Sequence, residues 1–314
     1  MQHQTRDRLV NRALSVAGHS GKETPVNVTS SPPDGPPLLP EPQPAGTVTI
    51  NRRRWWIHLL LITAYILLVG VLGRVRREAR VHFPVLSHTA RGLLLVCAIE
   101  LSGFALVLGL ALVASRASRD DLLLRWRRGF WPVPLGIGYS VAIRLAIFIL
   151  TLVASIALIV TQVMTPQSVQ VFFAANRPEV ETIVDITAMR ENSLYFWLVL
   201  TVVSFVVAGL REELWRSAFL AGLRTLWPQH FGTRTGQITA VLIAAAVFGF
   251  AHLGMGLIAV LLAGLIGLAL GLIMVFHRSI WPAVIAHGMF DATSLALLPW
   301  IAEKLPEIQR TLGH

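Results

Sequence analysis

Cysteine and charge are both scarce in this chain of 314 residues. Its single cysteine, Cys97, lies in an apolar run, which excludes an internal disulfide and a metal site built on several cysteines. Charged residues make up 14% of the chain, whereas a typical soluble domain carries roughly 25%. Hydrophobic residues make up 54% and are gathered into long runs. Together these features exclude a large soluble protein and are typical of a membrane protein.

Positive charge is placed beside the apolar runs. The net charge of +10 comes mostly from arginines, which cluster at 52–54, 74–80 and 116–128. Such clusters are expected from the positive-inside rule and from attraction to anionic lipid. No basic face with interleaved aromatic residues lies outside the apolar runs, so we expect a lipid bilayer and no nucleic acid as partner.

Seven apolar runs are long enough to cross a bilayer, which takes about 20 residues. No alternating barrel pattern competes with helices, so we predict an all-α fold, a polytopic transmembrane helix bundle of about seven to eight spans. An eighth segment would arise if the longest run broke in two. The runs cover residues 55–73, 92–115, 133–163, 194–222, 237–254, 256–276 and 280–300.

Composition divides the chain into four parts. Residues 1–54 are polar and Pro-rich, and we expect a disordered tail with no signal peptide at its start. Residues 55–193 hold the N-terminal transmembrane helices and loops. Residues 194–300 form the predicted catalytic transmembrane core, and residues 301–314 a C-terminal tail.

Loop charges predict the orientation of the later spans. Residues 164–193 are acidic, whereas the flanking segments 116–128 and 224–234 are basic. The acidic loop is therefore expected outside and its neighbours in the cytoplasm of a multi-pass protein of the plasma (inner) membrane. Alternation then puts the arginines of 74–80 outside, against the rule, which leaves the orientation of the first span open.

Polar residues within spans are costly and are usually paired or functional. For Glu100 and Arg144 we expect a structural role, as an ion pair or through contacts with backbone and water. Gly264, Gly267 and Gly271 recur at close helical spacing, which is typical of tight helix packing.

The last third of the chain carries a denser set of ionisable residues on three predicted helices. At 1.5 Å per residue, they lie roughly 10–22 Å from the cytoplasmic ends of those helices, so they can meet inside the membrane. Spacings of four residues place Glu212 with Arg216, His287 with Asp291, and Phe248 with His252 on shared faces. The candidate site residues are Glu212, Glu213, His252, His287 and Asp291, supported by Arg216 and Phe248.

Three short motifs occur in order on these helices. They read REELWR at 211–216, FGFAH at 248–252 and HGMFD at 287–291, with SIWPA at 279–283 before the last. Over about 195–300 the sequence resembles the CPBP family of CAAX proteases and bacteriocin-processing enzymes, which are glutamic intramembrane proteases that include the Ras-converting CAAX endopeptidase.

The resemblance implies an intramembrane endopeptidase acting on a membrane-associated peptide or protein. A glutamate, here Glu212 or Glu213, would activate water with the help of His252. His287, positioned by Asp291, would stabilise the oxyanion. The resemblance implies no covalent nucleophile, and we expect no metal and no cofactor.

The first motif departs from the family pattern. The family usually has three residues between the second glutamate and the arginine, whereas only Leu214 and Trp215 intervene here. We favour the register of the glutamates, because the chemistry needs a carboxylate, and the choice of base between Glu212 and Glu213 stays open. Asp291 stands where the family often has asparagine, and orienting His287 is the role that suits a carboxylate.

Two other classes of function fit parts of the pattern. Glutamates, histidines and an aspartate could hold zinc in an intramembrane metalloprotease, although no HExxH helix is present. Polar residues within spans also occur in transport proteins, and the altered first motif is compatible with a non-catalytic scaffold or immunity protein.

Overall fold

The protein is a bundle of apolar helices. The computed structural model describes residues 51–78, 88–126, 129–176, 178 and 184–312. The predicted tail therefore lies almost entirely outside the described residues. Within them, seven helical segments are long and apolar enough to cross a membrane, which confirms the predicted all-α multi-pass fold.

Each predicted apolar run corresponds to one candidate span. The run expected at 133–163 forms one continuous helix, so it supplies one span and not two. The spans are α1 (Arg52–Glu78), α2 (Ala90–Ser115), α3 (Pro132–Val160), the segment Ser193–Leu226, α9 (Arg234–Ala251), α10 (Leu257–His277) and α11 (Trp281–Leu312). Shorter helices are α4 (Pro166–Ala175), α5 (Ile186–Glu191) and α8 (Pro228–Phe231), and η3 (Leu253–Met255) is a single 3-10 turn.

The span Ser193–Leu226 changes its helical form along its length. It begins as α6 (Ser193–Leu198), continues as the π-helix η2 (Val199–Leu210) and ends as α7 (Arg211–Leu226). The Ser204 hydroxyl donates to the carbonyl of Val199, five residues earlier, at 2.9 Å. Wide π turns occur mostly as short stretches and often beside functional sites. Here the π-helix gives way to the α-helix directly before the two glutamates.

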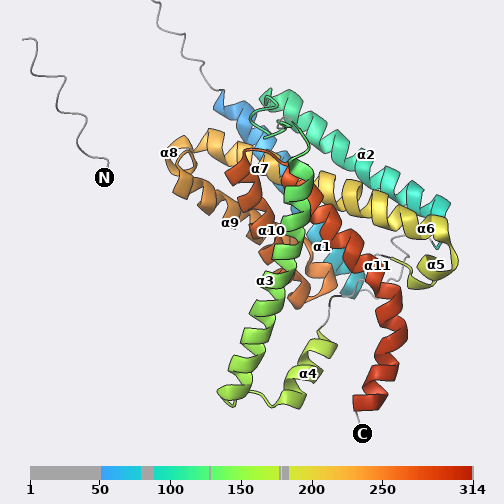
Figure 1. Ribbon diagram of the computed structural model, residues 1–314. Coiled ribbons are helices and arrows are strands. Elements are labelled where there is room, and N and C mark those ends of the chain that lie inside the picture. Colours follow the sequence, from blue (N-terminus) through green and yellow to red (C-terminus); the bar gives the residue numbers. More distant parts are fainter. Residues whose placement is uncertain (1–50, 79–87, 127–128, 177, 179–183, 313–314) are drawn as a thin grey trace, which may run out of the picture. The chain divides into compact units, whose positions relative to one another are not determined.

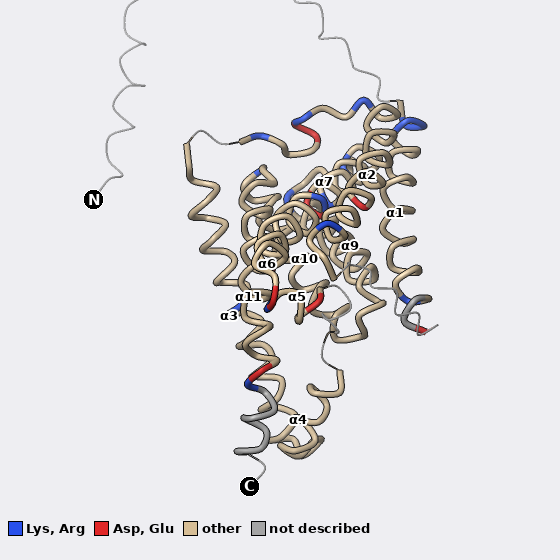
Figure 2. Tube along the Cα trace, turned by 90° about the vertical axis from the view of Figure 1, so that its right-hand side faces the viewer, with Lys and Arg blue, Asp and Glu red and all other residues tan. Residues whose placement is uncertain are grey.

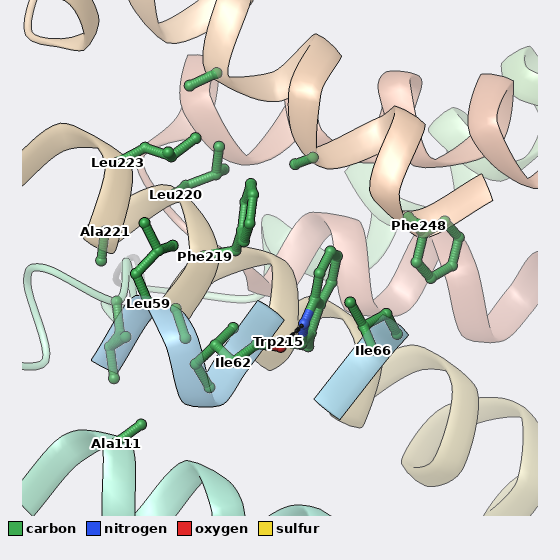
Figure 3. Packing of buried hydrophobic residues seen from close by; sticks show 14 of the residues in the cluster. Leu59, Ile62, Ile66, Ala111, Trp215, Phe219, Leu220, Ala221, Leu223 and Phe248 are labelled. Carbon is green, nitrogen blue, oxygen red and sulfur yellow. Dashed lines mark hydrogen bonds between the residues drawn. The ribbon is translucent and has the colours of Figure 1, made fainter. Parts of the chain in front are cut away.

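Helix packing surrounds this span with neighbours from both halves of the sequence. α1 lies against α2, α7 and α9, while α11 lies against η2 and α3 (Figure 1). Trp215 of α7 stacks on Phe219, with ring centroids 5.4 Å apart, and its indole Nε1 donates to the carbonyl of Ile62 at 2.9 Å (Figure 3). A second contact joins α1 and α7, because Nε2 of the fully buried His58 lies 3.0 Å from the carbonyl oxygen of Ala218.

Three polar contacts identify the loops that share one end of the bundle. Arg52 donates to the carbonyl of Leu226 at 3.3 Å, and Arg224 to that of Asp121 at 2.6 Å. The Ser279 hydroxyl donates to the carbonyl of Arg125 at 2.8 Å. The start of α1 and the loops after α2, α7 and α10 therefore lie together. Lys and Arg residues, blue in Figure 2, mark this end of the tube, whereas the spans are mostly uncharged.

Candidate active site

The two glutamates lie in the first turn of α7 and face different surroundings. Glu213 is completely buried and forms an ion pair with Arg216, which is also completely buried. The side chain of Glu212 keeps 15% of its exposure, and its Oε1 accepts from Arg211 at 3.0 Å. One carboxylate is thus enclosed in the protein, while the other retains an open side.

His287 of α11 joins both carboxylates. Its Nδ1 lies 3.0 Å from Oε1 of Glu213. On the other side of the ring, Nε2 lies 3.7 Å from Oε2 of Glu212 and 3.6 Å from Oδ2 of Asp291. Four of the five predicted site residues are therefore gathered around one imidazole.

These distances assign protons to the His287 ring. A carboxylate only accepts hydrogen bonds, so Nδ1 carries the hydrogen that it donates to Glu213. A bare lone pair on Nε2 would then face the oxygens of Glu212 and Asp291, and the like partial charges would repel. A proton on Nε2 relieves that repulsion. Because both carboxylates lie beyond ordinary hydrogen-bond distance, the Nε2–H group is not committed to either of them.

Arg216 is held between two apolar helices. Its guanidinium lies over the ring of Phe248, 4.5 Å from the centroid. A Cβ added at Gly267 would come within 3.3 Å of Arg216 Nη2, and one added at Gly271 within 3.4 Å of its Cδ. These glycines were expected to allow tight helix packing, and two of them, Gly267 and Gly271, leave the space that the buried Arg216 side chain occupies. Apart from the pair with Glu213, the guanidinium nitrogens have no hydrogen-bond partner among the described residues.

Arg211 forms a contact that the sequence did not indicate. Its Nη1 lies 3.0 Å from Glu100 of α2, while its Nη2 holds Glu212. Glu100 therefore has a structural partner as expected, but the partner is on α7. The phenol hydroxyl of Tyr65 on α1 lies close enough to interact with the charges of Arg211, Glu100 and Glu212.

His252 stands apart from the carboxylates. It follows the last residue of α9, and its Nδ1 lies 3.0 Å from the carbonyl of Phe248. Its ring lies 4.8 Å from that of Phe248, which in turn lies 6.4 Å from the ring of His287. In the part of the chain that the structure describes, no hydrogen bond or ion pair joins His252 to Glu212 or Glu213. The turn after His252 packs closely on α1. A Cβ added at Gly254 would lie only 2.7 Å from the backbone of Gly73, so only glycine fits there.

Arg144 of α3 contacts only neutral groups. Nη1 donates to the Ser140 hydroxyl at 2.6 Å and to its carbonyl at 3.2 Å. Nη2 reaches across to α11, where its partners are the carbonyls of Met289 and Phe290 and the hydroxyls of Thr293 and Ser294. This agrees with the expected backbone contacts of this residue.

The structure also alters one expected pairing. Spacing placed Arg216 on a face with Glu212, but Arg216 pairs with Glu213, three residues away. Phe248, expected as a support, contacts Arg216, His252 and His287. Among the described residues, no group of three or more His, Cys, Asp and Glu side chains is arranged to hold a metal ion.

The three motifs lie within a segment that matches a known family. Residues 193–293 match the Rce1-like family of type II CAAX prenyl endopeptidases. This confirms the resemblance inferred from the motifs and supports an intramembrane protease, a hydrolase with several membrane spans. The Rce1-like segment begins with α6 and ends on α11, so it contains all seven predicted site and supporting residues. Among curated proteins and solved structures, no match to the chain was found.

Proposed function

We propose that this protein is a glutamate-dependent intramembrane endopeptidase in which Glu212 is the general base. The observation that carries the proposal is the different burial of the two glutamates. Glu213 is enclosed and occupied by Arg216 and His287, whereas Glu212 retains exposed surface beside His287. A general base must reach the water that it deprotonates, and Glu212 meets that condition.

Glu213 then serves as the anchor of the site. Arg216 neutralises it, and its remaining oxygen accepts the Nδ1–H of His287. That bond fixes the ring so that Nε2–H is directed toward the side where Glu212 and Asp291 lie. A fixed donor of this kind stabilises the negative charge that develops on a peptide carbonyl oxygen during attack by water.

His252, which packs on the Phe248 ring, supplies a second acceptor. Since its Nδ1 lies against a backbone carbonyl, Nδ1 carries the hydrogen and Nε2 carries the lone pair. In the reaction, water attacks the carbonyl carbon while Glu212, assisted by His252, accepts its proton. The proton then passes to the leaving amine as the C–N bond of the tetrahedral intermediate breaks, and no covalent bond forms between enzyme and substrate.

The name of the matched family supports the substrate class, a protein or peptide whose C-terminal CAAX cysteine is prenylated. The basic end of the bundle supports placement of the loops after α2, α7 and α10 on the cytoplasmic side of a plasma membrane. Glu212 lies 12 residues before Arg224, or roughly 18 Å from that end, and a prenyl chain can reach such a depth through lipid.

The test uses the purified full chain in lipid nanodiscs and a farnesylated, internally quenched CAAX peptide. We expect cleavage by the parent protein, loss of cleavage in Glu212→Gln, and unchanged cleavage after exhaustive treatment with metal chelators. Cleavage of the peptide by Glu212→Gln at the parent rate would refute the assignment of the base. Loss of activity on chelation, restored by added zinc, would refute the metal-free mechanism.

A further inference from the structure

Arg144 is a cation inside a membrane span, and it forms no ion pair with any residue that the structure describes. It lies 12 residues from the start of α3, or roughly 18 Å along a helix that spans the membrane. Among the described residues, no carboxylate lies within 4.0 Å of its guanidinium, although ion pairs at that distance are found for Arg211 and Arg216. An arginine at such a depth is costly and is usually paired or functional.

The partners of Arg144 form a polar patch on α11. Thr293 and Ser294 are exposed, and their hydroxyls lie against Nη2 together with the Phe290 carbonyl. The guanidinium also lies over the Phe290 ring, 4.4 Å from its centroid. Arg144 itself is half-buried, and its Nε–H has no acceptor among the described residues. The Thr293 and Ser294 hydroxyls donate to the carbonyls of Met289 and Phe290, so among these groups the Arg144 Nε–H is the donor left for an anion. A planar guanidinium with a free N–H is the kind of group that binds a carboxylate.

The patch lies next to the proposed catalytic groups. Phe290 precedes Asp291, and Arg144 is close enough to Asp291 to interact with its charge. Along α11, residues 290–294 lie three to seven positions beyond His287, or roughly 5–10 Å at 1.5 Å per residue. An extended peptide covers about 3.3 Å per residue, so a chain two to three residues long bridges the two places.

We propose that Arg144, held against α11 by Thr293 and Ser294, binds the free C-terminal carboxylate of the substrate and thereby fixes the distance between the chain end and the cleaved bond. The inference rests on the proposed function, because it concerns the substrate of the same site. Within the membrane this carboxylate supplies the directly paired anion that Arg144 lacks among the described residues, since Asp291 acts on it only from beyond 4.0 Å. Arg144 in turn lowers the cost of bringing the carboxylate there. The enzyme then selects chain ends and rejects internal peptide bonds.

The experiment compares two farnesylated, internally quenched CAAX peptides that differ only in ending as a carboxylate or as a carboxamide. For the parent protein, we expect kcat/KM to be at least about tenfold higher for the carboxylate, the effect of one hydrogen bond to a charged group. Arg144→Gln is expected to remove this preference by slowing only the carboxylate peptide, and Arg144→Lys to retain part of it. If Arg144 merely tied α3 to α11, the substitution would instead slow both peptides equally.

Arg190→Gln is the matched control. Arg190 also donates to a carbonyl of α11, that of Pro299 at 2.6 Å, but it has its own counter-ion in Glu303 at 3.6 Å. We expect this variant to keep the preference for the carboxylate. Equal kcat/KM of the parent for both peptides would overturn the inference and leave the proposed function standing.

A binding measurement separates the two proposals where no cleavage occurs. Fluorescence anisotropy of both peptides with Glu212→Gln gives the ratio of their Kd values without hydrolysis. A ratio of about tenfold that disappears when Arg144→Gln is added supports the carboxylate site even if the parent cleaves neither peptide. A ratio near one overturns it.

Discussion

Nδ1 of His287 lies 3.0 Å from Oε1 of Glu213, and this hydrogen bond joins α11 to α7 at the centre of the candidate site. Glu213 and Arg216 are both completely buried, so the contact belongs to a chain of charged groups enclosed in the protein. Removing one member of such a chain leaves the others without their partner. The two neighbouring glutamates should therefore respond very differently to the same substitution.

Glu213→Gln is expected to destabilise the protein, and Glu212→Gln to inactivate it. The first substitution leaves Arg216 as an unpaired buried cation, at a cost of about 3–5 kcal/mol. The second changes a partly exposed carboxylate and should leave thermal unfolding close to that of the parent. Thermal melts in detergent and cleavage rates of both variants provide the test. Equal loss of melting temperature in the two variants would contradict the different roles.

Gly267→Ala is expected to be harmful, whereas Gly264→Ala is expected to be tolerated. A Cβ at Gly267 would meet the Phe248 ring at 2.9 Å and Arg216 at 3.3 Å, but at Gly264 its nearest neighbour is the Ala245 carbonyl at 3.6 Å. We expect Gly267→Ala to cost about 1–3 kcal/mol by overpacking. Gly264→Ala should fall within about 1 kcal/mol of the parent, because alanine also favours helix. Melting temperatures that fall alike in both variants would show that Arg216 does not depend on this space.

Substitution of the two histidines should separate activity from stability. His287→Gln loses the ring that contacts Glu213, so both the cleavage rate and the melting temperature should fall. His252 lies against only a carbonyl and an aromatic ring, so His252→Gln should lower the rate at least about 100-fold, the scale of acid–base catalysis, with little change in melting temperature. A His252 variant with the parent rate would remove this residue from the mechanism.

Stability should depend on pH through Asp185, which lies outside the spans. Hydrogen bonds from His88 and from the backbone N–H of Ala188 hold the pKa of Asp185 below its ordinary value. Because the folded-state pKa is the lower one, the stabilisation is present at neutral pH. It is lost as the pH falls below about 4.

Asp185→Asn should therefore lower the unfolding free energy by up to about 1 kcal/mol at pH 7. Its melting temperature should converge with that of the parent at the lowest pH. Asp120→Asn, in an exposed pair with Arg125, is the control and should show little effect at either pH. A constant difference between Asp185→Asn and the parent across the pH range would contradict the assignment.

The seven spans were predictable because each is a long apolar run, and hydrocarbon leaves helices as the only form for such runs. The rule that residues four apart share a face placed His287 and Asp291 on one face of a helix, and in the structure Nε2 of His287 lies 3.6 Å from Oδ2 of Asp291. The same rule could not choose between Glu212 and Glu213 as the partner of Arg216. Positions three and four apart are both neighbours on a helix, so the choice depends on what the rest of the protein packs around them.

Contacts between distant helices were beyond the sequence. The pair between Arg211 and Glu100 joins residues 111 positions apart, and no local pattern encodes which helices become neighbours. Arg211 at the start of the first motif and the lone Glu100 in another span were the available signals. The π-helix before α7 was also unforeseen, because its apolar residues fit an ordinary helical span equally well.

The contacts of α1 show that the segment that matches the family does not contain all of the packing around the candidate site. The segment that matches the family begins at residue 193, yet α1 accepts the indole hydrogen of Trp215, places His58 against Ala218 and abuts the turn after His252 at Gly73. A fragment or chimera cut at the boundaries of the match would lack these supports. The matched segment thus contains the candidate site residues, while a fragment meant to keep the packing around them should also include α1, which ends more than 100 residues before residue 193.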